Sequence, residues 1–86
     1  MISAVDDTGK VLITMPDDAA TWADEVLVLH VVRAYEKLPV TMSAAERVQW
    51  AALSVVKAVT PRNMRDQQRE DRLIAHPMIM ILLMRG

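Results

Sequence analysis

The alternation of apolar and polar positions predicts a β-hairpin at the start of the chain. Two short runs, Ile2 to Val5 and Lys10 to Met15, flank the turn-forming residues Asp6-Asp7-Thr8-Gly9. In the second run Val11, Ile13 and Met15 alternate with Lys10, Leu12 and Thr14. This period of two is typical of a half-buried strand, and the glycine can supply the positive φ angle of a tight turn. The pattern therefore predicts a hairpin over residues 1–15.

A helical period replaces the alternation after Pro16. Asp17 or Asp18 can accept hydrogen bonds from the free amides at a helix start, which predicts a helix over 18–38 that ends before Pro39. At about 100° per residue, one face collects the expected core residues Ala20, Ala23, Leu27, Val31, Ala34, Tyr35 and Leu38. Five further apolar residues fall outside that face, beside charged residues: Trp22, Val26, Val28, Leu29 and Val32. This helix is therefore expected to bury surface on two sides.

A second helix is predicted over 44–59. Ser43 and Glu46 have the spacing at which a serine and a glutamate cap each other's backbone amides, and Pro61 follows the end of the apolar period. Its expected core positions are Val48, Ala51, Ala52, Val55 and Val59, while Trp50 and Leu53 broaden the apolar band.

The last third of the chain divides into a charged and an apolar segment. The composition predicts a charged helix over 61–75, either solvated or a mobile connector, and an apolar segment over 77–85. The seven residues from Met78 to Met84 suit a buried strand as well as two helical turns, and periodicity does not decide between them; methionine and leucine favour the helix. Together the elements predict a mainly α fold: one small domain over 1–86, with three or four helices and an N-terminal hairpin.

The composition indicates more apolar surface than one small core can hide. Of the 86 residues, 52% are hydrophobic and none is cysteine. A domain of this size buries only about 60 to 65% of its unfolded surface and often needs a disulfide, a metal or a partner chain. A disulfide is excluded, and His30 and His76 stand too far apart in sequence to suggest a metal site. We therefore expect a homodimer, formed through the 18–38 helix and the 77–85 segment.

Four arginines form a second candidate surface. Arg62, Arg65, Arg69 and Arg72 recur at helical spacing and fall within about 80° of one helix face. Such a stripe can contact an acidic protein surface or the backbone of a nucleic acid. It can equally be a solvated face, neutralised by the acidic residues within the same turns. The charge distribution adds a weak indication of association, because residues 1–42 carry three basic against seven acidic groups and residues 43–86 carry seven against four.

These features favour a non-enzymatic protein-binding module, a small regulator or inhibitor that occludes a surface of a larger protein. Short phage or mobile-element inhibitors and small regulatory adaptors share this character. The residues expected to contact the partner are the four arginines of the stripe together with Trp22, Leu29, Val32 and Trp50, and Tyr35 is a further candidate anchor. The identity of that partner protein is not encoded in any motif.

Catalytic signals are absent from the sequence. There is no glycine-rich phosphate loop and no cysteine nucleophile, and the three serines have no histidine pattern that would activate them. We expect no enzyme activity, no cofactor and no metal. No signal-peptide pattern and no apolar stretch of about 20 residues is present, so we expect a cytoplasmic protein without a membrane partner.

One stretch offers an alternative function. Val11-Leu12-Ile13-Thr14-Met15-Pro16-Asp17-Asp18 leads into a helix, a second capped helix begins at Ser43, and this order resembles the opening of ribbon-helix-helix DNA-binding proteins. The resemblance implies a dimeric transcriptional regulator whose paired strands enter the major groove of DNA. It further implies base contacts from Lys10, Leu12 and Thr14, with nucleic acid as the partner.

Overall fold

The computed structural model describes residues 1–61 and 64–85 and has a mainly helical fold with an N-terminal hairpin, as predicted. Its elements are β1 (Ile2–Val5), β2 (Val11–Met15), the 3-10 helix η1 (Asp17–Thr21), α1 (Asp24–Lys37), α2 (Ala44–Val59), α3 (Gln67–Ile74) and α4 (Pro77–Arg85).

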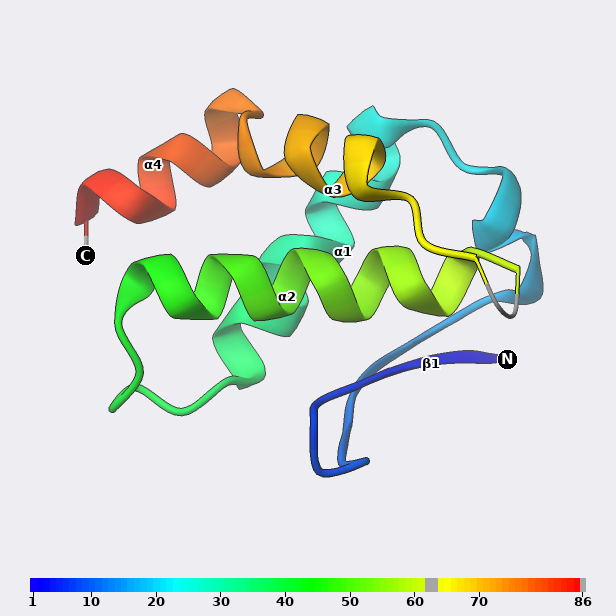
Figure 1. The fold of residues 1–86 in the computed structure, drawn as a ribbon, viewed down its shortest axis with the longest axis horizontal. Coiled ribbons are helices and arrows are strands. Elements are labelled where there is room, and N and C mark those ends of the chain that lie inside the picture. The colour runs from blue at the N-terminus through cyan, green and yellow to red at the C-terminus, as the bar shows by residue number, and fades with distance from the viewer. Residues whose placement is uncertain (62–63, 86) are drawn as a thin grey trace.

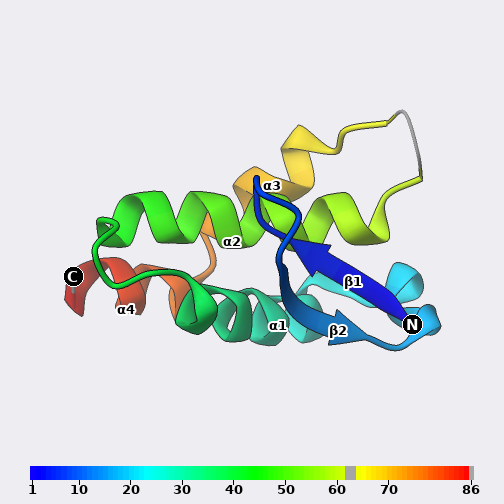
Figure 2. The same ribbon diagram turned by 90° about the horizontal axis from the view of Figure 1, so that it is seen from below.

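Three layers make up the fold. The central layer is the pair α1 and α2, whose facing valines, leucines and alanines form most of the buried core. The hairpin covers one side of this pair, with β1 against α2 and β2 against α1, and α3 and α4 cover the opposite side (Figures 1 and 2). α2 therefore contacts every other layer, which makes it the element around which the domain is built.

The hairpin contains an irregularity that changes which residues are buried. β1 and β2 pair antiparallel, Ala4 opposite Ile13, but the register shifts so that Val5 lies opposite Val11. The extra residue, Leu12, is 7% exposed and joins Ile13 in the core, whereas Val11 is exposed. The strict alternation predicted from the sequence, with Val11 inward and Leu12 outward, is therefore wrong at these two positions, because a bulge interrupts the period of two.

The predicted helix over 18–38 is two elements rather than one. η1 ends at Thr21, Trp22 and Ala23 are extended, and α1 begins at Asp24. The amides of Val26 and Leu27 bond to the carbonyl of Ala23, while the carbonyl of Trp22 accepts a bond from a side chain of α3. The carbonyl of Trp22 thus bonds to a side chain of α3 instead of to the backbone amide of Val26, which would be its partner in a continuous α-helix. The chain turns between η1 and α1.

The core face of α1 is largely as predicted. Leu27, Val31, Ala34, Tyr35 and Leu38 are all buried. Ala20 and Ala23 are exposed instead, because they precede the helix, and their place in the core is taken by Ala19 of η1 and Val28 of α1.

α2 has the predicted bounds and the predicted core face. The Ser43 hydroxyl accepts a bond from the Glu46 amide at 3.2 Å and donates one to the Glu46 carboxylate, also at 3.2 Å. In a full capping box the Glu46 carboxylate would accept a bond from the Ser43 backbone amide. Here it accepts the bond of the Ser43 hydroxyl instead. Ser54 and Val56 are buried as well, and the Ser54 hydroxyl is satisfied by the carbonyl of Ala51 at 3.0 Å.

The C-terminal third forms two short helices. The charged helix is shorter than predicted: α3 begins at Gln67, where the Asp66 carboxylate accepts a bond from the Arg69 amide at 2.9 Å. Of the predicted 61–75 segment, residues 62 and 63 lie outside the described residues. The 77–85 segment is helical, which decides the alternative that periodicity left open. Ile79 anchors α4 in the core.

Candidate interaction surfaces

The arginine stripe is tied into the protein itself. Arg69 Nε donates to Asp24 Oδ1 at 2.9 Å, and Arg72 Nε donates to Asp24 Oδ2 at 2.8 Å. Arg69 also bonds to the carbonyl of Trp22, and its side chain is only 15% exposed. One carboxylate at the first turn of α1 thus receives two guanidinium groups from α3, and the pair holds the outer layer on the central one.

This network changes the acidity of its members. The hydrogen bond from Arg72 is the main cause that lowers the pKa of Asp24, with the bond from Arg69 adding to it. The bond to Asp24 raises the pKa of Arg72 in turn. Both groups therefore stay charged over the physiological range, and the network persists there.

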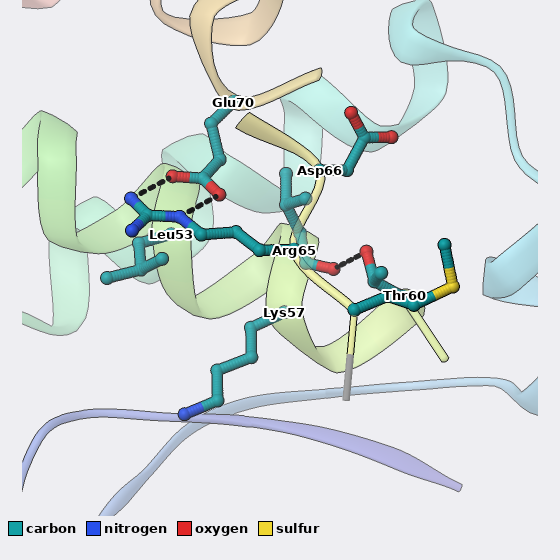
Figure 3. A pocket seen from close by; sticks show the side chains of 8 residues that line it. Leu53, Lys57, Thr60, Arg65, Asp66 and Glu70 are labelled. Atoms are coloured by element: carbon teal, nitrogen blue, oxygen red, sulfur yellow. Dashed lines mark hydrogen bonds and ion pairs between the residues drawn. The ribbon is translucent and has the colours of Figure 1, made fainter. Parts of the chain in front are cut away.

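Arg65 of the stripe is also paired with a carboxylate. Arg65 lies before α3 and bonds to both carboxylate oxygens of Glu70, at 3.3 and 3.4 Å (Figure 3). Arg62 lies outside the described residues. Arg65, Arg69 and Arg72 are each paired with a carboxylate, which fits the alternative of a neutralised stripe. The partner of Arg69 and Arg72 is Asp24 of α1, which lies outside the charged segment and was not predicted from the sequence.

The apolar candidates on α1 differ in how much of each side chain is available. Leu29 is 47% exposed, whereas Val32 is partly buried against the core. Trp22 packs its ring against the ring of His30, with 4.7 Å between the centroids. Tyr35 is buried, and the Arg47 guanidinium lies 4.1 Å from its ring centroid, so Tyr35 is not an exposed anchor.

Trp50 is the aromatic residue that the structure leaves at a concave surface. It is 36% exposed and lines three adjoining hollows. The largest, about 350 Å³, lies between α2 and α3; the second, about 230 Å³, lies between the hairpin turn and the loop that follows α1. We call these three hollows the Trp50 cleft; their lining residues are Val5, Asp6, Asp7, Thr8, Leu38, Pro39, Met42, Gln49, Trp50, Leu53, Ser54, Lys57, Arg65, Gln67, Glu70, Asp71 and Ile74.

A further hollow of about 270 Å³ continues the cleft along α2. Leu53 and Lys57 line it from α2 (Figure 3), and the paired side chains of Arg65 and Glu70 line both this hollow and the one between α2 and α3. Its exposed wall is mostly apolar. Leu53 lines this hollow as well as two hollows of the Trp50 cleft.

Sequence reasoning placed Trp50 and Leu53 on the broad apolar band of α2 but did not find the cleft. The spacing of Trp50, Leu53 and Lys57 does put them on one helix face, which is a signal in the sequence. The acidic residues that line the cleft come from the hairpin turn and from α3. No local pattern in the sequence connects either segment to α2.

The strand residues of the DNA-binding alternative are not presented together. Lys10 and Thr14 are exposed, but Leu12 is in the core. The strand β2 pairs with β1 of the same chain. A base contact from Leu12 is therefore wrong for this fold, and the bulge described above is the reason.

The two histidines have structural contacts. His76 caps α4: its Nδ1 lies 3.1 Å from the amide nitrogen of Met78, and its Nε2 lies 3.1 Å from a carboxylate oxygen of Glu25. His30 Nδ1 lies 3.3 Å from the carbonyl of Val26. Within residues 1–61 and 64–85, no three His, Asp or Glu side chains are grouped closely enough to bind a metal ion.

Comparison with known proteins finds no family model, no curated protein and no solved structure that matches this chain. None of the helices in the described part of the chain combines the length and the apolar character needed to cross a bilayer.

Proposed function

We propose that this protein is a non-enzymatic binding module, a small regulator or inhibitor that covers a functional surface of a larger protein. The observation that carries the proposal is Trp50, a large aromatic side chain that is more than one third exposed and lines all three hollows of the cleft. Tryptophan is one of the residue types enriched among binding hot spots, which cluster near the centre of an interface.

The arginines enter this proposal in a changed role. Because Arg69 and Arg72 are bonded to Asp24, they support the fold on which the cleft is built rather than contact the partner. Arg65 lines the cleft while paired with Glu70, so its contribution to binding is a polar edge and not a free positive charge.

Self-association remains part of the proposal and involves a different surface. Leu29 and Val26 of α1 and Met80, Ile81 and Met84 of α4 are each more than 40% exposed. If these side chains form one contiguous patch, that patch would favour an interface. We propose that this surface forms the homodimer expected from the composition, which leaves the Trp50 cleft for the partner.

The first experiment is affinity capture from cells that express the chain, with wild type and Trp50→Ala compared. Val40→Ala is the matched control, because Val40 is an apolar side chain, 84% exposed, that does not line the cleft. Capture of a specific protein by wild type and Val40→Ala, but not by Trp50→Ala, is the expected result. Equal capture by all three variants would show that the cleft is not the binding surface.

Light scattering coupled to size-exclusion chromatography tests the homodimer. We expect a mass of twice 9.7 kDa for wild type and of 9.7 kDa after Ile81→Lys. A wild-type monomer at high concentration would refute the dimer without affecting the Trp50 cleft.

Duplex titration at low salt separates the DNA-binding alternative from the proposal. A DNA-binding dimer would bind with an affinity that falls steeply as salt rises. Lys10→Ala or Thr14→Ala would then alter its base preference. We expect no binding, and salt-dependent binding with such a change in preference would replace the protein-binding proposal.

A further inference from the structure

The walls of the Trp50 cleft carry an excess of carboxylates. Asp6 and Asp7 of the hairpin turn stand on one side of Trp50, and Glu70 and Asp71 of α3 stand on the other. Two cations line the same hollows, Lys57 and Arg65. Because Arg65 bonds to both oxygens of Glu70, those two charges offset each other.

Two of the remaining carboxylates, Asp6 and Asp71, accept hydrogen bonds from neighbouring residues. Asp6 Oδ1 accepts bonds from the Thr8 hydroxyl at 2.6 Å and from the amides of Thr8 and Lys10, both at 2.9 Å. The bond from the Thr8 hydroxyl is the main cause that lowers the pKa of Asp6, so the group remains ionised. The Asp71 carboxylate accepts a bond from the side-chain amide of Gln67 at 3.2 Å. Asp6 and Asp71 thus place negative charge on either side of Trp50 and Leu53.

The backbone of the walls indicates what kind of segment can bind between them. Within the hairpin turn, the amide of Asp6 bonds to the carbonyl of Lys10, and the amide of Gly9 bonds to the carbonyl of Asp6. The opposite wall is a helix, whose main-chain groups bond internally. The main-chain groups of the hairpin turn and of α3 are thus largely bonded within the protein. A helix, which satisfies its own backbone, can bind between these two walls through side-chain contacts alone.

We propose that the Trp50 cleft binds an amphipathic helix of the partner that carries lysine or arginine on both sides of its apolar stripe. Its apolar residues, spaced three and four apart, contact Trp50 and Leu53. Its basic residues face Asp6 and Asp7 on one wall and Asp71 on the other. This inference rests on the proposed function, since it names the chemistry of the segment that the cleft would bind.

A displayed library of 16-residue helical peptides tests the inference on the whole chain. The apolar stripe is kept constant, and the flanking positions vary among Lys, Glu, Gln and Ser. Peptides are selected on wild type and then counter-selected on Trp50→Ala, so that only peptides dependent on the cleft remain. We expect lysine to be enriched at flanking positions on both sides of the stripe.

Affinities of the selected peptides for charge-neutral variants give the second measurement. Replacing both Asp7 and Asp71 by asparagine keeps the shape of the walls and removes two charges. Since an exposed ion pair contributes a factor of about 1.4 to 5, we expect binding to weaken about twofold to thirtyfold. Asp18→Asn is the matched control, because Asp18 is an exposed acidic residue of η1 outside the cleft. It should leave the affinity unchanged.

Three outcomes distinguish the two proposals. Enrichment of lysine together with weaker binding to the Asp7→Asn, Asp71→Asn variant supports both. Peptides that depend on Trp50 but show acidic or neutral flanks, or bind the double variant unchanged, overturn the basic helix and leave the binding module intact. If no selected peptide depends on Trp50, the proposed function itself fails at this surface.

Discussion

Asp24 is the residue whose replacement tests the architecture most directly. Its carboxylate joins the first turn of α1 to Arg69 and Arg72 of α3. In Asp24→Asn one oxygen can still accept a bond from one guanidinium, while the new amide group faces the other guanidinium with a second donor. The variant therefore loses one charge-assisted hydrogen bond, weakens the other, and leaves Arg69 without a countercharge in a mostly buried position.

The exposure of the two arginine side chains sets the expected loss of stability. A hydrogen bond to a charged group contributes about 1.5 to 3 kcal/mol, and an exposed ion pair about 0.2 to 1 kcal/mol. Arg69 is 15% exposed and Arg72 is 55% exposed, so the first pair belongs near the upper range and the second near the lower. We expect Asp24→Asn to reduce the free energy of unfolding by about 2 kcal/mol. Domains of this size have about 5 to 10 kcal/mol in total, so the loss is substantial.

Urea unfolding followed by circular dichroism measures this loss. With a urea dependence of about 1 kcal/mol per molar, the midpoint should fall by about 2 M. Glu36→Gln is the control, because Glu36 is an exposed acid on the same helix whose side chain makes no ion pair with any described residue. A midpoint for Asp24→Asn within about 0.5 M of both wild type and Glu36→Gln would refute the reasoning.

The pH dependence of the same variant gives an independent check. The folded state lowers the pKa of Asp24, so its contribution to stability is present above the unfolded value of about 3.9 and is lost as pH falls through the lowered folded value. The stability difference between wild type and Asp24→Asn should therefore be constant near neutral pH and narrow below about pH 4. A difference that stays constant down to pH 2 would contradict the assignment of the network to Asp24.

Three further substitutions test other contacts, each by urea unfolding. Ser43→Ala removes the cap of α2 and should cost about 1 kcal/mol, while Ser43→Asn, which retains a capping oxygen, should cost little; equal losses would contradict the capping role. Gly9→Ala places a side chain at a φ of 87° and should cost about 1 kcal/mol, so an unchanged stability would show that the turn relaxes. Ile79→Ala should cost about 2 to 5 kcal/mol and speed amide exchange in α4; a loss below about 1 kcal/mol would refute the docking of α4 through Ile79.

Local chemistry determined several elements from the sequence alone. The bounds and core face of α2 follow from a serine cap, a sustained helical period and a terminating proline, all of which act within a few residues. The hairpin follows in the same way from a turn sequence with one glycine that needs a positive φ angle. These predictions are correct because the physical causes are short-range.

Contacts between distant residues decided what the sequence left open or predicted wrongly. The arginine spacing indicated a shared helix face, but the countercharge of Arg69 is Asp24, 45 residues earlier in the chain, and the same arginine bonds to the carbonyl of Trp22 where the predicted first helix is interrupted. The burial of Leu12 depends on a bulge, which follows from how two strands pair and not from the period of one.

The Trp50 cleft shows the same division. The sequence by itself places Trp50 and Leu53 on one face of a helix, because a helix has a fixed period. Only the tertiary structure brings the hairpin turn to one side of that face and α3 to the other, and with them the carboxylates of both walls. A helix face is defined by residues three and four apart, whereas a cleft is defined by which layers pack together, and that packing depends on the whole chain at once.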